Sequence, residues 1–311
     1  MPEGDTIRRL ADDLNRRFGG QQVLSSVFRH PRLATLNMAG QQFQSADAHG
    51  KHLLMRFDNG RSLHIHLRMN GSVVRGIPRN VPAYRRRFDM QFTGGWIAGI
   101  DLPVLELLRT RDEASLLAYL GPDICGTYNH RVALERLAHA GTMPLSAAML
   151  DQRLAAGFGN IYAVETPFIV GLNPFTPVAA IENLDAVLSI GVALIRTNAR
   201  RGPQNTRGIR LDTSEHWVLN RHIRVCRWCD CELVRIEGAH SPWGRRTAFC
   251  PQCQPDSQTQ ADLGRASTLL KLHPARQLLD PATLRLKEQK FSQVETLPTA
   301  ARPTARYRRR L

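Results

Sequence analysis

The chain opens with a helical pattern of hydrophobic and polar positions. Apolar side chains recur at intervals of three and four residues, which places them on one face of a helix: Ile7, Leu10, Ala11, Leu14 and Phe18. Two glycines, Gly19 and Gly20, follow the last of them and are typical of a helix end. The pattern therefore predicts a helix over residues 5–18, with Asp5 or Thr6 as its N-cap.

The pattern changes to short β-like runs between about residues 21 and 100. Turn sequences such as Asp58-Asn59-Gly60, Asn70-Gly71 and Gly94-Gly95 separate these runs. The runs cover residues 23–28, 52–57, 62–67, 88–92 and 96–100. We expect them to pair as an antiparallel sandwich or barrel.

A helical period returns after about residue 125, where we place a domain boundary. The predicted helices cover residues 131–140, 146–154, 161–170 and 184–197, and Pro167 should end or kink the third. A turn with two glycines, Gly157-Phe158-Gly159, precedes that helix and puts Asn160 near its N-cap. Free N–H groups at a helix start can bind phosphate, although most turns of this kind only reverse the chain.

Two cysteine pairs give the strongest local signal. Cys226 and Cys229, followed after 20 residues by Cys250 and Cys253, have nearly the spacing of a structural zinc site. Cys231 is a fifth thiol that could replace Cys229 as a ligand. Residues 232–237 and 244–249 predict the two arms of a hairpin. Arg245 and Arg246 would lie on the returning arm, where we favour a phosphate contact over plain solvation.

The last 55 residues differ in composition from the rest. They are rich in Gln, Ser, Thr, Ala and Pro and end in an arginine run, which predicts a mostly disordered basic arm with a short helix near residues 266–272. The chain then divides into a β domain (1–125), a helical domain (126–222), a zinc finger (223–256) and this tail (257–311).

The charge balance favours a polyanionic partner. The formal net charge is +15, and only four of the 42 basic residues are lysines. A basic protein without a membrane-spanning run or an amphipathic anchor is better suited to nucleic acid than to a lipid surface. Lys51 is the one lysine before residue 271. It either survives a codon bias by accident or fills a position that needs an ammonium able to release its proton.

The first residues could carry a nucleophile. Removal of Met1 would leave the secondary amine of Pro2 beside the carboxyl group of Glu3. A terminal amine has a pKa near 8, so roughly a tenth of it is neutral at pH 7, and it condenses with an aldehyde carbon to a charged iminium. Met-Pro is also a common start, so these residues alone decide nothing.

Five segments in this order resemble the formamidopyrimidine-DNA glycosylase and endonuclease VIII family. They are Pro2-Glu3-Gly4, Gly50-Lys51-His52-Leu53-Leu54, His66-Leu67-Arg68-Met69-Asn70-Gly71, residues 151–163 with Gly157-Phe158-Gly159-Asn160, and residues 246–254 with Cys250 and Cys253. The resemblance covers residues 1 to about 255. It implies an α+β multidomain protein with an N-terminal β-sandwich and catalytic helix, a helix-two-turn-helix domain and a C-terminal zinc-finger hairpin.

The resemblance also implies residue roles. Pro2 would attack C1′ of the damaged nucleotide, Glu3 would assist ring opening, and Lys51 would bind phosphate and transfer a proton. Asn160 and Arg245, with Arg246 beside it, would contact the DNA backbone, and one structural Zn²⁺ would bind the four paired cysteines. Met69 would enter the space left by the flipped nucleotide. A lone methionine, however, is more often core filler.

Several departures from the family pattern bear on the substrate. Thr6 stands where the family usually has a second carboxylate, and residues 100–106 lack the arginine-rich turn of the formamidopyrimidine branch. Residues 198–221 lack that branch's glycine-rich purine-capping pattern. These absences favour the endonuclease VIII-like branch and oxidised pyrimidines. An 8-oxoguanine glycosylase of the same family and a non-catalytic zinc-containing DNA-binding protein are the alternatives. We expect a monomer that works on damaged DNA in the cytoplasm at the nucleoid, without a membrane.

Overall fold

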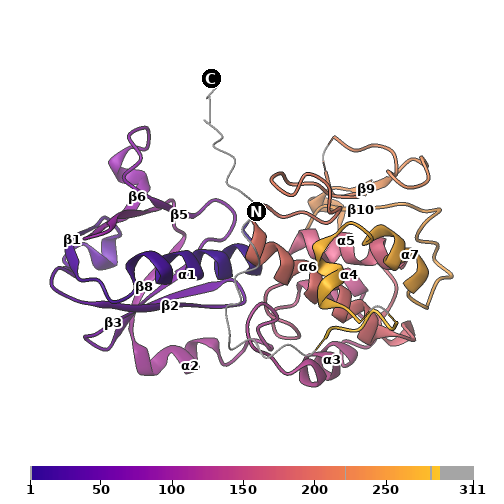
Figure 1. The fold of residues 1–311 in the computed structure, drawn as a ribbon, viewed down its shortest axis with the longest axis horizontal. Coiled ribbons are helices and arrows are strands. Elements are labelled where there is room, and N and C mark those ends of the chain that lie inside the picture. Colours follow the sequence, from indigo (N-terminus) through magenta and orange to yellow (C-terminus); the bar gives the residue numbers. More distant parts are fainter. Residues whose placement is uncertain (1, 221, 281, 288–311) are drawn as a thin grey trace.

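The computed structural model describes residues 2–220, 222–280 and 282–287, which form two lobes joined near the start of the first helix (Figure 1). The first lobe holds the strands of a β-sandwich, and the second holds most of the helices and a small hairpin. No helix among these residues is long and apolar enough to cross a membrane.

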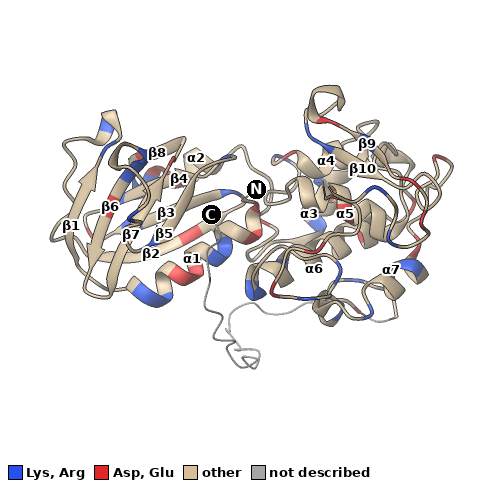
Figure 2. Ribbon diagram, turned by 90° about the horizontal axis from the view of Figure 1, so that it is seen from above, with Lys and Arg blue, Asp and Glu red and all other residues tan. Residues whose placement is uncertain are grey.

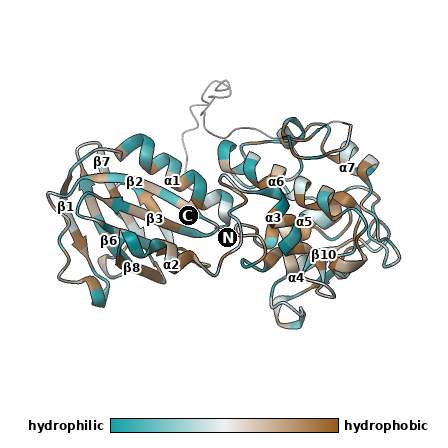
Figure 3. Ribbon diagram, turned by 90° about the horizontal axis from the view of Figure 1, so that it is seen from below, coloured by the Kyte–Doolittle hydropathy of each residue, from teal (hydrophilic) through white to brown (hydrophobic). Residues whose placement is uncertain are grey.

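Helix α1 (Gly4–Phe18) begins earlier than the apolar pattern predicts. Its N-cap residue is Glu3, whose side chain makes no capping bond, so the prediction of Asp5 or Thr6 as the cap is wrong. The reason is burial, because Glu3 and Asp5 both turn into the protein. The predicted apolar face is buried apart from Leu10, which is half-buried, whereas the outer turns of α1 are hydrophilic (Figure 3).

The sandwich consists of two four-stranded antiparallel sheets. One has the strand order β1-β6-β7-β5 and the other β2-β3-β4-β8. The bounds are β1 (Val23–Phe28), β2 (Phe43–His49), β3 (His52–Phe57), β4 (Arg61–His66), β5 (Ser72–Arg75), β6 (Arg86–Phe92), β7 (Gly95–Ile100) and β8 (Val104–Arg109). All five predicted strands are present, and β2, β5 and β8 are additional.

Aromatic rings fill the space beneath α1. The ring of Phe18 stacks on Phe92 with centroids 4.7 Å apart, and Phe43 meets both Phe92 and Phe57 edge-on. These side chains are almost completely buried. Because α1 supplies Ile7, Leu14 and Phe18 to the same core, its position on the sandwich is fixed along most of its length.

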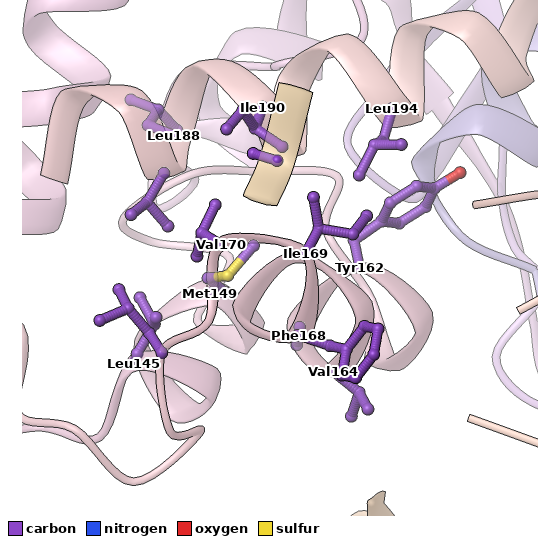
Figure 4. Packing of buried hydrophobic residues seen from close by; sticks show 14 of the residues in the cluster. Leu145, Met149, Tyr162, Val164, Phe168, Ile169, Val170, Leu188, Ile190 and Leu194 are labelled. Carbon is purple, nitrogen blue, oxygen red and sulfur yellow. The ribbon is translucent and has the colours of Figure 1, made fainter. Parts of the chain in front are cut away.

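The second lobe contains α2 (Glu113–Leu117), α3 (His130–Ala138), α4 (Leu145–Leu150), α5 (Asn160–Val170) and α6 (Leu184–Arg201). Side chains from α4, α5 and α6 interlock, among them Met149, Phe168 and Ile190 (Figure 4). The hydroxyl of Tyr162 points away from this cluster in Figure 4 and accepts a hydrogen bond from Asn198 Nδ2 at 2.8 Å.

Pro167 does not end α5 where the sequence predicted a break. The helix continues to Val170 and stops at Gly171, whose φ of 73° is left-handed. Proline has no N–H to donate to the carbonyl one turn earlier, that of Ala163. Ser146 on α4 supplies the replacement, because its hydroxyl donates to that carbonyl at 2.5 Å. The packing of α4 on α5 therefore offsets the missing bond.

The cysteine-rich hairpin is shorter than its predicted arms. Strands β9 (Val234–Ile236) and β10 (Thr247–Phe249) pair antiparallel. Arg245 and Arg246 lie in the turn segment just before β10 rather than on the strand. The remaining short elements are 3-10 helices: η1 (Pro31–Leu33), η2 (Ala83–Arg85), η3 (Thr110–Asp112), η4 (Val178–Ala180), η5 (Gly238–His240) and η6 (Pro274–Leu278).

The prediction of disorder is wrong for the first part of the tail. Helix α7 (Leu263–Leu269) and η6 pack on the second lobe, with six tail residues in its core cluster: Ala266, Leu269, Leu270, Ala275, Leu278 and Leu279. The average composition hid this apolar set, since the arginine run of the last residues dominates the count. Residues 288–311, which include that run, lie outside the described residues.

Candidate active site

Glu3 is completely buried where the two lobes meet. Its Oε1 accepts a hydrogen bond from the backbone N–H of Ile161 at 2.9 Å, in the first turn of α5. Its Oε2 has no hydrogen-bond partner among the described residues. A Cβ at Gly159 would come within 2.3 Å of Glu3 Cδ, so only glycine there leaves room for the carboxyl group.

The surroundings of Glu3 favour its protonated form. Burial raises the pKa of Glu3 to about 7, because a carboxylate loses its hydration there. The nearby ammonium of Lys51 opposes this rise, whereas the carboxyl group of Asp5 adds to it. At neutral pH, Glu3 is therefore divided between acid and base and can both donate and accept a proton.

The head of α1 is docked on the glycine turn before α5. Gly4 N–H donates to Gly157 O at 3.0 Å, and a Cβ on Gly4 would lie 2.7 Å from Gly157 Cα. Gly157 itself has φ of 128°, a conformation that favours glycine. Three glycines thus let two backbones approach closely, which places Pro2 and Glu3 beside the start of α5.

Lys51 lies at the turn between β2 and β3, at the start of the predicted strand. Burial lowers the pKa of the Lys51 ammonium, Glu3 opposes this shift, and the charge of Arg245 reinforces it. Lys51, Glu3 and Arg245 therefore share one electrostatic environment. The lowered pKa fits the prediction that this position needs an amine able to release its proton.

Asp123 holds the Lys51 turn to α1, and sequence reasoning missed it. One oxygen accepts from Gly50 N–H at 3.2 Å, and the other accepts from Arg8 Nη2 at 2.8 Å. Arg8 also pairs with Asp47 on β2 at 3.0 Å. The only sequence signal was its place after Gly121-Pro122, which reads as an ordinary turn.

Asp5 is a second buried carboxyl group near Glu3. It is completely buried, accepts from Gln204 Nε2 at 3.0 Å, and leaves its other oxygen without a partner among the described residues. Burial raises the pKa of Asp5 above its usual range. Thr6, at the position of the family's usual carboxylate, is only half-buried. The carboxyl group beside Glu3 is thus supplied one position earlier.

The predicted DNA-contacting residues converge on the same face. Asn160 Nδ2 donates to Arg246 O at 2.9 Å, and its Oδ1 is buried without a partner among the described residues. Arg245 contacts Met69 Sδ at 3.3 Å, and Met69 is 53% exposed. Arg246 pairs with Glu237 at 3.1 Å. The exposed Arg245 guanidinium has no carboxylate partner in the described part of the chain.

Basic side chains occur on both lobes, around as well as beside this face (Figure 2). They are therefore placed to meet a long polyanion that extends past the site in both directions. Neutralising several phosphates at once is the main source of sequence-independent DNA affinity.

The four paired cysteines form a compact cluster. The sulfurs of Cys226, Cys229, Cys250 and Cys253 all lie within 4.8 Å of one another. Individual separations are 3.9 Å for Cys226–Cys253 and 3.4 Å for Cys229–Cys250. A tetrahedral zinc site with bonds of ~2.3 Å needs sulfurs about 3.8 Å apart, which this set matches. Cys231 is outside the cluster and directs its thiol to Glu232 O.

Comparison with known proteins assigns the family. The model of the formamidopyrimidine-DNA glycosylase N-terminal domain matches residues 1–102. A protein named probable endonuclease 8 2 from Streptomyces coelicolor is 33% identical over 261 residues, covering 82% of this chain and 94% of the relative. A DNA-(apurinic or apyrimidinic site) lyase from Mycolicibacterium smegmatis is 33% identical, covering 83% of this chain and all of the relative. The chain belongs to the formamidopyrimidine-DNA glycosylase and endonuclease VIII family. These relatives place it in the endonuclease VIII-like branch.

A solved structure confirms the fold. Formamidopyrimidine-DNA glycosylase from Lactococcus lactis, crystallised with DNA that contains an abasic site, superposes with a TM-score of 0.68 at 23% identity. The match covers 82% of this chain and 100% of that protein. The predicted α+β architecture with an N-terminal sandwich is therefore correct. The remaining 18% of this endonuclease VIII-like chain has no counterpart in that structure.

Proposed function

We propose that this protein excises oxidised bases, with pyrimidines favoured, through a covalent intermediate on Pro2, and then cuts the DNA strand on both sides of the lesion. The class of activity, DNA glycosylase combined with abasic-site lyase in base excision repair, follows from its family and from the relatives named for these activities. The observation that carries the residue assignment is the buried Glu3, with its pKa raised to about 7, next to the position of Pro2.

The proposed reaction begins at the Pro2 nitrogen. Once Met1 is removed, the amine forms a bond to C1′ while the bond from C1′ to the base breaks and the base leaves with the electron pair. The Glu3 proton goes to the ring oxygen as the sugar opens. The resulting iminium acidifies C2′, so loss of a proton there expels the 3′ phosphate. A second elimination expels the 5′ phosphate.

Lys51 and the turn before α5 would hold the phosphates. The Lys51 ammonium lies near Glu3, and its lowered pKa suits it to receive and return a proton during the eliminations. Asn160 lies in the first turn of α5, whose free N–H groups and dipole favour an anion. Arg245 would contact a neighbouring phosphate, with Arg246 at the rim. Met69, exposed and adjacent to Arg245, would fill the gap left by the flipped nucleotide.

Cys226, Cys229, Cys250 and Cys253 would hold one structural Zn²⁺. The metal would fix the ends of the hairpin that carries Arg245, without taking part in the reaction. Metal analysis should find about one equivalent of zinc in the wild type and in Cys231→Ser, and much less in Cys250→Ser. Full metal retention in Cys250→Ser would reject this ligand set.

Borohydride trapping on abasic-site DNA tests the central assignment. The reductant should convert the iminium to a stable amine and leave the protein attached to DNA through its N-terminal peptide. A variant with one glycine inserted before Pro2 is the matched control, because it keeps the fold and removes the prolyl terminal amine. An adduct that maps to Lys51, or equal trapping of the control, would overturn the Pro2 assignment.

One observation favours a second substrate class. Relatives named formamidopyrimidine-DNA glycosylase, such as that of Gloeobacter violaceus, are 31% identical, close to the values for the endonuclease 8 group. Excision of thymine glycol and dihydrouracil should therefore be compared with excision of 8-oxoguanine in the same duplex. A clear purine preference would replace the pyrimidine assignment. In either case we propose a monomer that acts at the nucleoid, in the cytoplasm, where its DNA substrate is.

A further inference from the structure

The segment after the cysteine cluster is anchored firmly to the helical lobe. Asp262 N–H donates to Val170 O at 2.8 Å, and Arg265 Nε donates to Phe168 O at 3.1 Å. The Arg265 guanidinium also lies over the Phe168 ring, 4.6 Å from its centroid. Residues 258–287, which we call the strap, thus begin at the C-terminal end of α5 and continue across the lobe.

The strap reaches a loop through a single buried histidine. His273 is 1% exposed, and its Nδ1 accepts from Ala275 N–H at 3.0 Å. Its Nε2 therefore carries the proton and donates to Asn205 O at 2.9 Å. Burial lowers the pKa of His273 to about 4, so the ring keeps this neutral form at physiological pH. A Cβ on Gly208 would lie 2.6 Å from His273 Cα, which shows how closely the two backbones approach.

Asn205 in turn organises the loop of residues 203–217. Its amide donates to three carbonyls and its Oδ1 accepts from two N–H groups, so every polar atom of this buried side chain is used: Ile209 O, Arg210 O, Thr213 O, Arg207 N and Gly208 N. The carbonyl of Asn205 that His273 binds belongs to the residue that fixes the loop's conformation. A contact at this point therefore acts on the whole loop.

The same loop touches the head of α1. Gln204, next to Asn205, donates to the buried Asp5 at 3.0 Å. Arg9 on α1 donates to Asn198 O at 2.8 Å and to Gly202 O, at the base of the loop. Asp5 is three positions from Pro2. A base attached to C1′ of a sugar bound at Pro2 would therefore lie within reach of this loop.

We propose that the strap, through His273, positions the 203–217 loop against α1 and that this loop sets the fit of the damaged base before excision. The inference rests on the proposed function of Pro2. A strap of this kind is an addition relative to the L. lactis enzyme, whose whole length is matched by 82% of this chain. His273 is a positioning residue, because it contacts the loop and not the substrate.

The two chemical steps separate positioning of the base from general damage. A base-contacting loop matters while the base is attached and has no role at a preformed abasic site. His273→Ala should therefore slow single-turnover excision of thymine glycol about tenfold, a loss of ~1.4 kcal/mol. Cleavage of preformed abasic-site DNA should change by less than about twofold. His273→Gln, whose amide can still donate to Asn205 O, should recover most of the excision rate.

Leu269→Ala is the matched control for stability. It removes a buried side chain from the same strap and leaves the His273–Asn205 bond in place. It should lower the melting temperature while excision and cleavage keep their wild-type ratio. Equal losses of both steps in His273→Ala, or an unchanged excision rate, would overturn the role of the strap. Failure of the proposed function is distinguished by the wild type, which would then excise no base and form no trapped adduct.

Discussion

Replacing Glu3 by glutamine removes a buried carboxyl group while keeping its shape. The pKa of Glu3 is raised from 4.5 to about 7 in the folded protein, so the native state binds more protons than the unfolded chain between these values. Stability from this group is fully present below about pH 4.5 and is lost as pH rises to 7. At 1.36 kcal/mol for each pKa unit, the loss amounts to about 3 kcal/mol.

Glu3→Gln cannot ionise and should escape that loss. Its Oε1 can still accept from Ile161 N–H, whereas its amide replaces an oxygen that has no partner in the described structure, at a cost that does not depend on pH. The difference in unfolding free energy, variant minus wild type, should therefore rise by about 3 kcal/mol between pH 4.5 and 8. The lowered pKa of Lys51 acts in the opposite direction at higher pH, so the series should end at pH 8.

Urea unfolding at half-unit pH intervals measures this difference directly. Glu135→Gln, on the exposed side of α3, controls for the change in net charge. A variant-minus-wild-type difference that stays flat across the interval would refute the buried, part-protonated carboxyl group. A fall with increasing pH would show that Lys51 pairs with Glu3 strongly enough to keep it ionised.

Three further changes test other parts of the site. Gly159→Ala should displace Glu3, because the new Cβ would lie 2.3 Å from its Cδ, and should cost about 1–3 kcal/mol in thermal unfolding together with most of the excision rate. Asp123→Ala should cost about 3–5 kcal/mol in urea unfolding, since it leaves the largely buried Arg8 without a main partner; Asp47→Ala, whose carboxylate is 47% exposed, should cost less than about 1 kcal/mol. Removing residues 288–311, with six basic and two acidic residues, should flatten the salt dependence of DNA binding by about 0.9 for each phosphate that this segment neutralises, and an unchanged slope would exclude the segment from the interface.

Local patterns predicted much of the fold because they depend on neighbouring residues. The strands of residues 23–28 and 52–57 have the bounds that β-branched and apolar runs indicate. Strand β2 was missed, since its sequence Phe-Gln-Ser-Ala-Asp-Ala-His has no β-branched residue and is held by pairing with β3. The order inside the tail was missed for a similar reason, because its leucines gain stability only against α5 and α6.

The site divides in the same way. Glu3, Lys51, Asn160 and the cysteines stand in short motifs that the sequence displays. Asp123 and Gln204 act through partners more than 70 positions away and have no motif of their own. Asp5 was interpreted as a cap because its immediate neighbours favour that role, and its burial follows only from the lobe that covers it.

Helix α1 belongs to both lobes at once. Its Arg8 reaches Asp47 in the sandwich and Asp123 at the boundary, while Arg9 reaches the end of α6. The amine and the acid therefore ride on the element that joins the two halves, rather than on either half. A hinge motion large enough to admit or release a duplex would have to pivot about this helix, and the reacting groups lie close to such an axis, where displacements are smallest. The enzyme could thus flex widely at its outer surfaces and still keep its chemistry in register.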